Sequence, residues 1–201
     1  MEDHPRIARS RASSHTVKAS PTLRIGVIAD THGLYDPAVE QHFAGVTEIF
    51  HAGDIGDRAV LQHLRQLAPV TVVSGNVDDY ERSGFPRRLL VHRGGCKIAL
   101  CHVLYEKGSM TKEALAWLDQ AQPDICVFGH SHKPTLDRHN KTILFNPGSA
   151  GPKRFSLPRG IGLLTINGGN AVPSLIRLQD RAAARKTSST GSVRRAKGDG
   201  R

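Results

Sequence analysis

The sequence has no long hydrophobic run, which excludes an integral membrane protein built from helices. No stretch approaches the roughly 18 consecutive apolar residues that cross a bilayer, so we expect no membrane span. The first residues also lack the apolar core of a secretory signal, and the expected compartment is the cytoplasm. With 201 residues, 38% of them hydrophobic, and a mean hydropathy of −0.34, the chain suits one compact domain with additional polar material.

Cysteine is scarce, and its spacing excludes a cysteine-based metal or redox motif. The three cysteines, Cys96, Cys101 and Cys126, form no CxxC pair and lie inside apolar runs. Isolated cysteines of this kind behave as small buried hydrophobes. We therefore expect all three to be reduced and chemically inert.

Acidic residues are too few to balance the basic ones, and the excess is uneven. The 28 basic and 18 acidic residues give a formal charge of +10. Residues 1–22 carry four basic and two acidic side chains, and residues 179–201 carry seven and two. We expect these segments to be disordered basic tails around a nearly neutral domain at 23–178. Contact with nucleic acid is then expected only through the tails, weakly and with strong salt dependence.

From residue 23 onward, short apolar runs alternate with amphipathic segments. Strands are predicted at 23–29, 46–50 and 70–73, separated by a helix at 36–43 and another carrying Val60 to Ala68. Asp36 and Pro37 have the residue types of an N-cap and a first helical position. A strand, helix, strand, helix, strand order favours parallel pairing with helices covering the sheet.

The second half of the chain has a different pattern. A hairpin is predicted around Gly94-Gly95, followed by an amphipathic helix from Met110 to Ala121 and a buried strand at 124–128. A mainly antiparallel series of strands follows, at 135–139, 142–145, 161–167 and 171–178. The expected architecture is α/β, with two mixed β-sheets facing each other and helices outside.

Residues suited to metal binding recur just beyond the ends of predicted strands. Open α/β sheets place their binding sites at this edge. In chain order the residues are Asp30 and His32, Asp54, Asn76, His102, and His130 and His132. Each fragment is common alone, but five of them in order after five strands indicate a single site.

These seven residues are more ligands than one ion requires. Two carboxylates, one amide oxygen and four imidazoles suit manganese, iron, zinc, cobalt or nickel better than calcium. A dinuclear site with Asp54 as the bridging ligand divides them naturally. Two ions about 3.5–4 Å apart can hold a bridging hydroxide and clamp phosphoryl oxygens.

The same residues resemble the motifs of a known family. Asp30-x-His32, Gly53-Asp54, Gly75-Asn76, His102 and Gly129-His130-Ser131-His132, followed by Asn146-Pro147-Gly148-Ser149, are similar to the calcineurin-like metallophosphoesterases. The resemblance is strongest to the small YfcE-type phosphodiesterase branch, which also includes the retromer scaffold subunit. It covers residues 23–178.

The resemblance implies a four-layer αββα sandwich and a specific division of the ligands. One metal would be held by Asp30, His32, Asp54 and His132, and the second by Asp54, Asn76, His102 and His130. The cofactor would be two divalent transition-metal ions, with manganese expected and iron, zinc, cobalt, nickel or magnesium as alternatives.

The function expected from this site is hydrolysis of a small phosphate ester, with a phosphodiester favoured over a phosphomonoester. Asp54 and Asn76 would then act in catalysis as well as in metal binding. The competing hypothesis is a non-catalytic, metal-binding interaction scaffold of the same fold. A homo-oligomer is left open.

Two positions depart from the family pattern. Relatives usually have His-Gly-His where this chain has His102-Val103-Leu104. Asp78 occupies the place where many phosphatases carry a histidine proposed to protonate the leaving group, so Asp78 is either a general acid or a hydrogen-bonded loop residue. Lys153 and Arg154 are either contacts for a substrate phosphate or a solvated pair.

Overall fold

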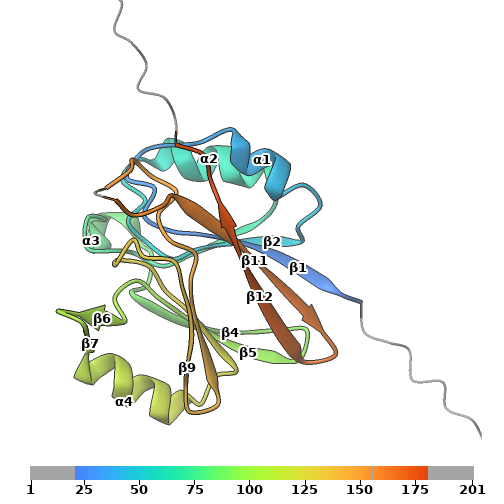
Figure 1. Cartoon of the computed structure of the whole chain (residues 1–201), viewed down its shortest axis with the longest axis vertical. Coiled ribbons are helices and arrows are strands. Elements are labelled where there is room, and N and C mark those ends of the chain that lie inside the picture. Colours follow the sequence, from blue (N-terminus) through green and yellow to red (C-terminus); the bar gives the residue numbers. More distant parts are fainter. Residues whose placement is uncertain (1–20, 155, 181–201) are drawn as a thin grey trace, which may run out of the picture.

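The structure is a computed structural model that describes residues 21–154 and 156–180 (Figure 1). The predicted tails, 1–22 and 179–201, lie outside the described residues, apart from residues 21, 22, 179 and 180. No helix in the described part of the chain is long and apolar enough to span a membrane.

The first β-sheet combines both ends of the described chain. Its strands, in spatial order, are β12 (Asn170–Arg177), β11 (Gly160–Asn167), β1 (Leu23–Ile28), β2 (Glu48–His51) and β3 (Val70–Val72). β1, β2 and β3 are parallel, as the alternating pattern predicted, and β11 joins β1 in the antiparallel direction. Helices α1 (Ala38–His42) and α2 (Arg58–Leu67) pack against the outer face of this sheet.

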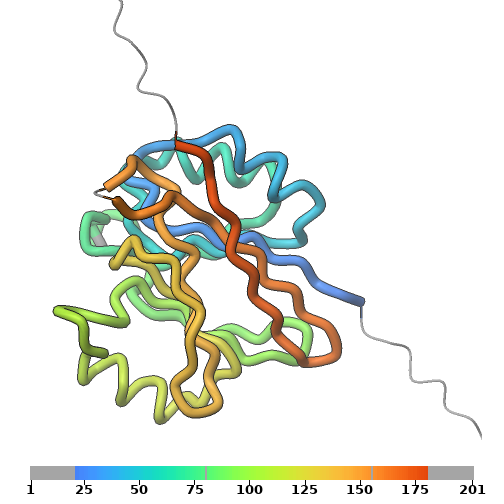
Figure 2. Tube along the Cα trace, in the orientation of Figure 1, coloured from blue at the N-terminus to red at the C-terminus, as the bar shows by residue number. Residues whose placement is uncertain are grey.

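The second β-sheet is made from the middle of the chain, as the green to yellow part of the tube in Figure 2 shows. Its strands, in spatial order, are β4 (Arg88–Arg93), β5 (Cys96–Cys101), β8 (Ile125–Val127), β10 (Thr142–Asn146) and β9 (Thr135–His139). Helix α4 (Lys112–Ala121) covers its outer face through Ala114 and Leu118.

The two sheets face each other across one apolar layer. Val27 and Phe50 project into this layer from the first sheet, and Ile98, Val127 and Phe145 project into it from the second. All five side chains are fully buried, because alternate residues of a strand point to the same face. The layers are therefore helix, sheet, sheet, helix, which confirms the αββα sandwich.

The chain between β5 and α4 differs from the prediction. Met110 was expected in the helix, but it belongs to the short strand β7 (Ser109–Met110), which pairs with β6 (Tyr105–Glu106). The helix begins only at Lys112, because Thr111 Oγ1 accepts a hydrogen bond from the backbone N–H of Ala114 and so caps it. Helix α3 (Tyr80–Ser83) was also not predicted.

The three cysteines are buried and have free thiols, as expected. Cys96 contributes to the layer between the sheets, while Cys101 and Cys126 lie among the residues that pack beneath α4. None of them is one of the expected metal ligands.

Stability should depend strongly on whether a residue of the second sheet lies beneath the facing sheet or on the exposed edge strand β9. Phe145 and Leu136 are paired across β10 and β9, but Phe145 is 0% exposed and Leu136 is 54% exposed. Phe145→Ala should lower the free energy of unfolding by about 3–5 kcal/mol, because it leaves a cavity in the core. The matched Leu136→Ala variant should change it by less than about 1 kcal/mol. Urea unfolding of both variants measures the difference, and equal losses would contradict the assigned burial of the two side chains.

Candidate metal centre

Five chain segments bring the seven predicted ligands to one rim between the two sheets. Asp30 and His32 follow β1, and Asp54 follows β2. The remaining ligands lie beyond three other strands: Asn76 after β3, His102 after β5, and His130 and His132 after β8. The parallel strands of both sheets end on this side, so their loops meet there.

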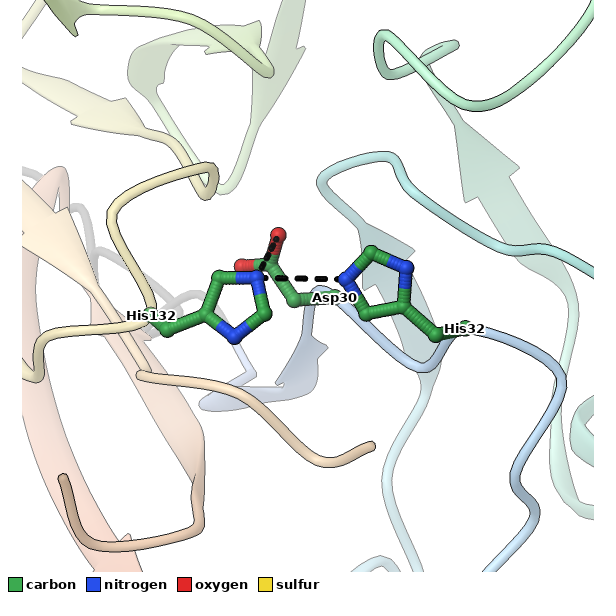
Figure 3. A group of neighbouring side chains, drawn as sticks. All are labelled: Asp30, His32 and His132. Atoms are coloured by element: carbon green, nitrogen blue, oxygen red, sulfur yellow. Dashed lines mark hydrogen bonds and ion pairs between the residues drawn. The ribbon is translucent and has the colours of Figure 1, made fainter. Parts of the chain in front are cut away.

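One half of the cluster is formed by two imidazoles and two carboxylates. Figure 3 shows the His132 ring facing both Asp30 and His32. Its Nε2 atom lies 3.1 Å from His32 Nε2 and 3.4 Å from Asp30 Oδ1. Asp54 Oδ2 lies 3.7 Å from the same His32 nitrogen. These four side chains are the set that the family resemblance implies for one metal ion.

The other half of the cluster centres on Asn76. Its Oδ1 atom lies 3.0 Å from His102 Nε2 and 2.9 Å from His130 Nδ1. Asp54 Oδ1 lies 3.3 Å from His102 Nε2. The two oxygens of the Asp54 carboxylate therefore face the two halves separately, so this carboxylate is placed to contact an ion in either half.

The protonation pattern of the cluster fits a bound cation. His102 Nδ1 lies 2.8 Å from the carbonyl oxygen of Ala52, which can only accept, so Nδ1 carries a proton. In the neutral ring, Nε2 then directs its lone pair at oxygens of Asn76 and Asp54, and these groups repel each other. A cation between them removes that repulsion, and nitrogen and oxygen donors of this kind bind divalent transition metals.

Two buried atoms of the cluster add to this argument. Asp30 Oδ2 and His132 Nδ1 have no hydrogen-bond partner within the described part of the chain. Buried polar atoms are almost always paired, and an unpaired one needs an explanation. An ion supplies a partner for the Asp30 carboxylate, while nothing described accounts for His132 Nδ1.

The two carboxylates of the cluster have opposite pKa shifts. Burial raises the pKa of Asp30 to about 7, and the nearby charge of Asp54 adds to the effect. Burial also opposes ionisation of Asp54, but the hydrogen bond and charge of His102 outweigh it and lower the pKa of Asp54 to about 2. Burial likewise opposes protonation of His102, and the same Asp54 hydrogen bond raises the pKa of His102 overall.

A buried histidine outside the ligand set ties two ligand loops together. His51 Nδ1 accepts a hydrogen bond from the N–H of Gly53 at 3.2 Å, so the proton of the neutral ring is on Nε2. Nε2 donates to Thr31 Oγ1 at 3.0 Å, and that hydroxyl donates to the carbonyl oxygen of Ile55 at 3.0 Å. Burial lowers the pKa of His51 to about 4, which keeps the ring neutral.

Asp78 holds the loops that carry Asp54 and Asn76. Its Oδ1 atom accepts hydrogen bonds from the backbone N–H groups of Ile55 and Gly56, at 2.9 and 3.2 Å. Its Oδ2 atom accepts one from Gly75 at 2.8 Å. Both oxygens therefore act as acceptors for backbone donors, which is the behaviour of an ionised carboxylate.

The segment from Asn146 to Ser149 lies directly beneath the ligands. Asn146 donates to the carbonyl oxygen of Gly129 at 2.8 Å, and so supports the loop that carries His130 and His132. Ser149 Oγ donates to the carbonyl oxygen of Asp30 at 2.8 Å. These bonds fix the ligand loops from below.

The backbone of the ligand loops is strained. Eight non-glycine residues of the described chain have positive φ, and five of them are predicted ligands: Asp30, His32, Asp54, His130 and His132. Such conformations cost free energy and persist where the surrounding structure enforces them, often at functional sites. Close packing enforces them here, since a Cβ atom on Gly75 would collide with Asp54.

A cavity of about 450 Å³ opens beside the Asn76 half of the cluster. Its lining includes Arg87, Arg88 and Val103, together with Asn76 and His102. Val103 is the position where relatives usually have a glycine and then a second histidine. The two arginines lie on β4 and just before it, outside the ligand motifs.

Comparison with known proteins matches the sequence of this chain to one superfamily. Residues 23–169 match the family model of the calcineurin-like phosphoesterase superfamily domain. A probable metallophosphoesterase of Methanocaldococcus jannaschii is 37% identical over 136 residues, which are 64% of this chain and 68% of the relative.

Solved structures agree with this match. A conserved uncharacterized protein of Streptococcus pneumoniae, described as a predicted phosphoesterase, is 26% identical with a TM-score of 0.64, over 79% of this chain and 91% of the other. Vacuolar protein sorting 29 of Cryptosporidium parvum is 22% identical with a TM-score of 0.62, over 79% and 99%. The likeness to vacuolar protein sorting 29 shows the fold alone.

The opposite pKa shifts predict opposite effects of removing each charge from the metal-free protein. A carboxyl whose pKa is raised in the folded state destabilises the fold as pH rises from about 4 to 7, whereas a lowered pKa stabilises it above about 4. At pH 8, Asp30→Asn should therefore raise the melting temperature by about 3 °C or more, and Asp54→Asn should lower it.

Thermal unfolding in the presence of a chelator, at pH 5 and pH 8, measures both effects. The gain from Asp30→Asn should shrink at pH 5, where the native carboxyl is already mostly protonated. With manganese added, the melting temperature of the wild-type protein should rise above that of Asp30→Asn, because manganese stabilises the wild-type protein more than either variant. A destabilised Asp30→Asn protein at pH 8 without metal would contradict the assigned shift.

Proposed function

This chain belongs to the calcineurin-like phosphoesterase superfamily, and from that premise we propose that it hydrolyses phosphate esters with two divalent transition-metal ions, manganese first among them. The observation that carries the proposal is the convergence of all seven ligand-type side chains on one rim, with the Asp54 carboxylate between the two halves. When bound, such ions act as Lewis acids that activate water and neutralise charge on a phosphoryl group.

The chain's own residues would divide the work as follows. Asp30, His32 and His132 hold one ion and Asn76, His102 and His130 hold the other, with Asp54 shared between them. The proton on His102 Nδ1 stays with the Ala52 carbonyl, so Nε2 remains free to bind metal. The His51–Thr31 bond and the three hydrogen bonds to Asp78 keep the loops from separating the ligands.

The hydrogen bonds of Asp78 support the proposed substrate class. A group that protonates a leaving group must carry a proton and be able to release it toward the substrate. Asp78 is instead an acceptor of three backbone N–H groups, so it is a poor acid. We therefore assign phosphodiesters with acidic leaving groups as the preferred substrates.

The cavity beside Asn76 is the natural place for one substituent of such a diester. Its volume of about 450 Å³ lies within the range of small-molecule pockets. Arg87 and Arg88 give it a cationic side, while Glu106 and Glu113 give it an acidic one. A polar organic group of mixed character suits this lining better than a purely apolar group.

The alternative, a non-catalytic scaffold, has a different expectation for the same site. A protein that uses this fold only to bind partners has no need to keep the ligand set complete. Here all seven positions hold residue types that bind metal, and their donor atoms face each other. This completeness favours the enzyme, and the experiments below separate the two hypotheses.

Loss of the Asn76 half of the cluster should abolish turnover without unfolding the protein. Asn76→Ala, His102→Ala and His130→Ala each remove one ligand, and each should lower the bound manganese from two ions per chain toward one. Hydrolysis should fall by about a hundredfold or more, because activation of water near neutral pH needs both ions. Elemental analysis and steady-state assay of the same preparations measure both quantities.

His92→Ala is the matched control, because His92 is an exposed histidine on β4 away from the cluster. It should retain wild-type metal content and turnover. A metal-loaded wild-type protein that hydrolyses neither aryl phosphodiesters nor phosphomonoesters would favour the scaffold. A ligand variant with full turnover would remove that residue from the proposed set.

The proposed substrate class predicts a higher kcat/KM for an aryl phosphodiester than for an alkyl phosphomonoester. Asp78→Asn should then lower turnover by a similar factor for aryl and alkyl leaving groups, since Asp78 acts on loop geometry. A general acid would behave differently, with a loss of about 10²–10⁴-fold concentrated on the alkyl leaving group. Faster cleavage of the alkyl monoester, or a loss that grows with leaving-group pKa, would overturn this assignment.

A further inference from the structure

A buried arginine fixes the loop that runs past the His32 half of the cluster. Arg159 Nη2 lies 2.7 Å from Asp36 Oδ2, and its N–H groups also donate to the carbonyl oxygens of Ala150 and Gly151. The base of the loop is tied to the first ligand segment, because the N–H of Gly151 donates to the carbonyl oxygen of Asp30 at 3.0 Å. The loop at 151–158 therefore starts from a rigid point next to the ligands.

This loop places one cation at the mouth of the metal centre. Arg154 Nη2 lies 3.4 Å from His32 Nε2, which is one of the atoms expected to bind metal. The N–H of Leu157 donates to the carbonyl oxygen of Arg154 at 3.2 Å, which closes a turn in this part of the loop. The side chain is exposed, and within the described residues no carboxylate forms an ion pair with it.

The neighbouring lysine, which has the same charge, is already paired. Lys153 Nζ lies 2.6 Å from Asp180 Oδ2. Of the two cations expected at this loop, only Arg154 faces the cluster with an unpaired charge in the described part of the chain. Its planar group can donate two parallel N–H bonds, which suits a phosphoryl group better than an ammonium does.

We propose that Arg154 binds a non-bridging phosphoryl oxygen of the substrate and so sets how the phosphate group sits over the His32 half of the centre. The inference rests on the proposed phosphoesterase function and assigns a substrate-contacting residue outside the ligand set. With a metal bound at His32 Nε2, that nitrogen would no longer accept from Arg154, and the N–H donors of Arg154 would be left for an anionic oxygen of the substrate. The cavity on the Asn76 side then receives the substituent of the ester.

Binding of inorganic phosphate to the manganese-loaded protein tests this directly. Calorimetric titration should show an affinity about tenfold weaker in Arg154→Ala than in the wild type, because one charge-assisted interaction is lost. Arg154→Lys should fall between them, since lysine keeps the charge but not the fork geometry. Lys153→Ala is the matched control and should bind phosphate as the wild type does. Manganese content should be the same in all four proteins.

Steady-state kinetics on an aryl phosphodiester supply a second measurement. Arg154→Ala should raise KM and lower kcat/KM by about tenfold or more. Wild-type phosphate affinity in Arg154→Ala would overturn the proposal. An equal loss of phosphate affinity in Lys153→Ala would also overturn it, because the effect would then come from the net positive charge of the loop and not from a contact by Arg154. Loss of manganese from Arg154→Ala would also overturn it, by making Arg154 a support for the ligands. The phosphate titration stands even if no ester is hydrolysed, so failure of the proposed function is recognised separately.

Discussion

The structure depends on one electrostatic constraint, which is the convergence of electron-pair donors at the ligand cluster. The buried His102 Nε2 lies 3.0 Å from Asn76 Oδ1 and 3.3 Å from Oδ1 of the buried Asp54, while Asp54 Oδ2 faces His32. Such an arrangement is unfavourable in a low-dielectric interior unless a cation joins it. In the absence of metal a proton on His102 takes part of that role, which is why the pKa of His102 is raised although burial opposes it.

The rest of the fold holds this unfavourable arrangement in place. The strands end in loops whose ligands have positive φ, and those loops are joined through the His51–Thr31 bond and the Asp78 carboxylate. Neither Asp78 nor His51 is expected to touch a metal, yet each connects ligand loops from different parts of the chain. The apolar layer between the sheets contributes rigidity, since Phe50 and Phe145 pack from opposite sheets beneath the rim.

Much of this could be predicted from the sequence, because strands buried on both faces leave continuous apolar runs and each run here ends in a polar ligand. The short strands β6 and β7 escaped prediction because two residues carry no periodicity. Met110 was wrongly placed in the predicted helix for a related reason. It is apolar at helical spacing and packs with the α4 cluster, but the Thr111 cap decides where the helix starts. The partners of Asp78 and Arg154 depend on loops brought together only by the tertiary fold.

The metal ligands and the residues around them are positioned by different parts of the fold, and this difference has a consequence for function. The seven ligand-type residues sit at strand ends, where the sheets fix their positions, and small changes there break several contacts at once. The residues around the centre lie at opposite sides of it, with Arg154 by His32 and the cavity lined by Arg87 and Arg88 by Asn76. The family pattern also breaks on one of these sides, at Val103. Changes at these loops can alter which ester is bound while the ligand geometry stays the same, because loops tolerate substitutions that strand ends do not. Substrate choice in this chain should therefore be sought at Arg87 and Arg88, in the segment 103–111 and at Arg154, and its chemistry in the ligand-bearing strand ends.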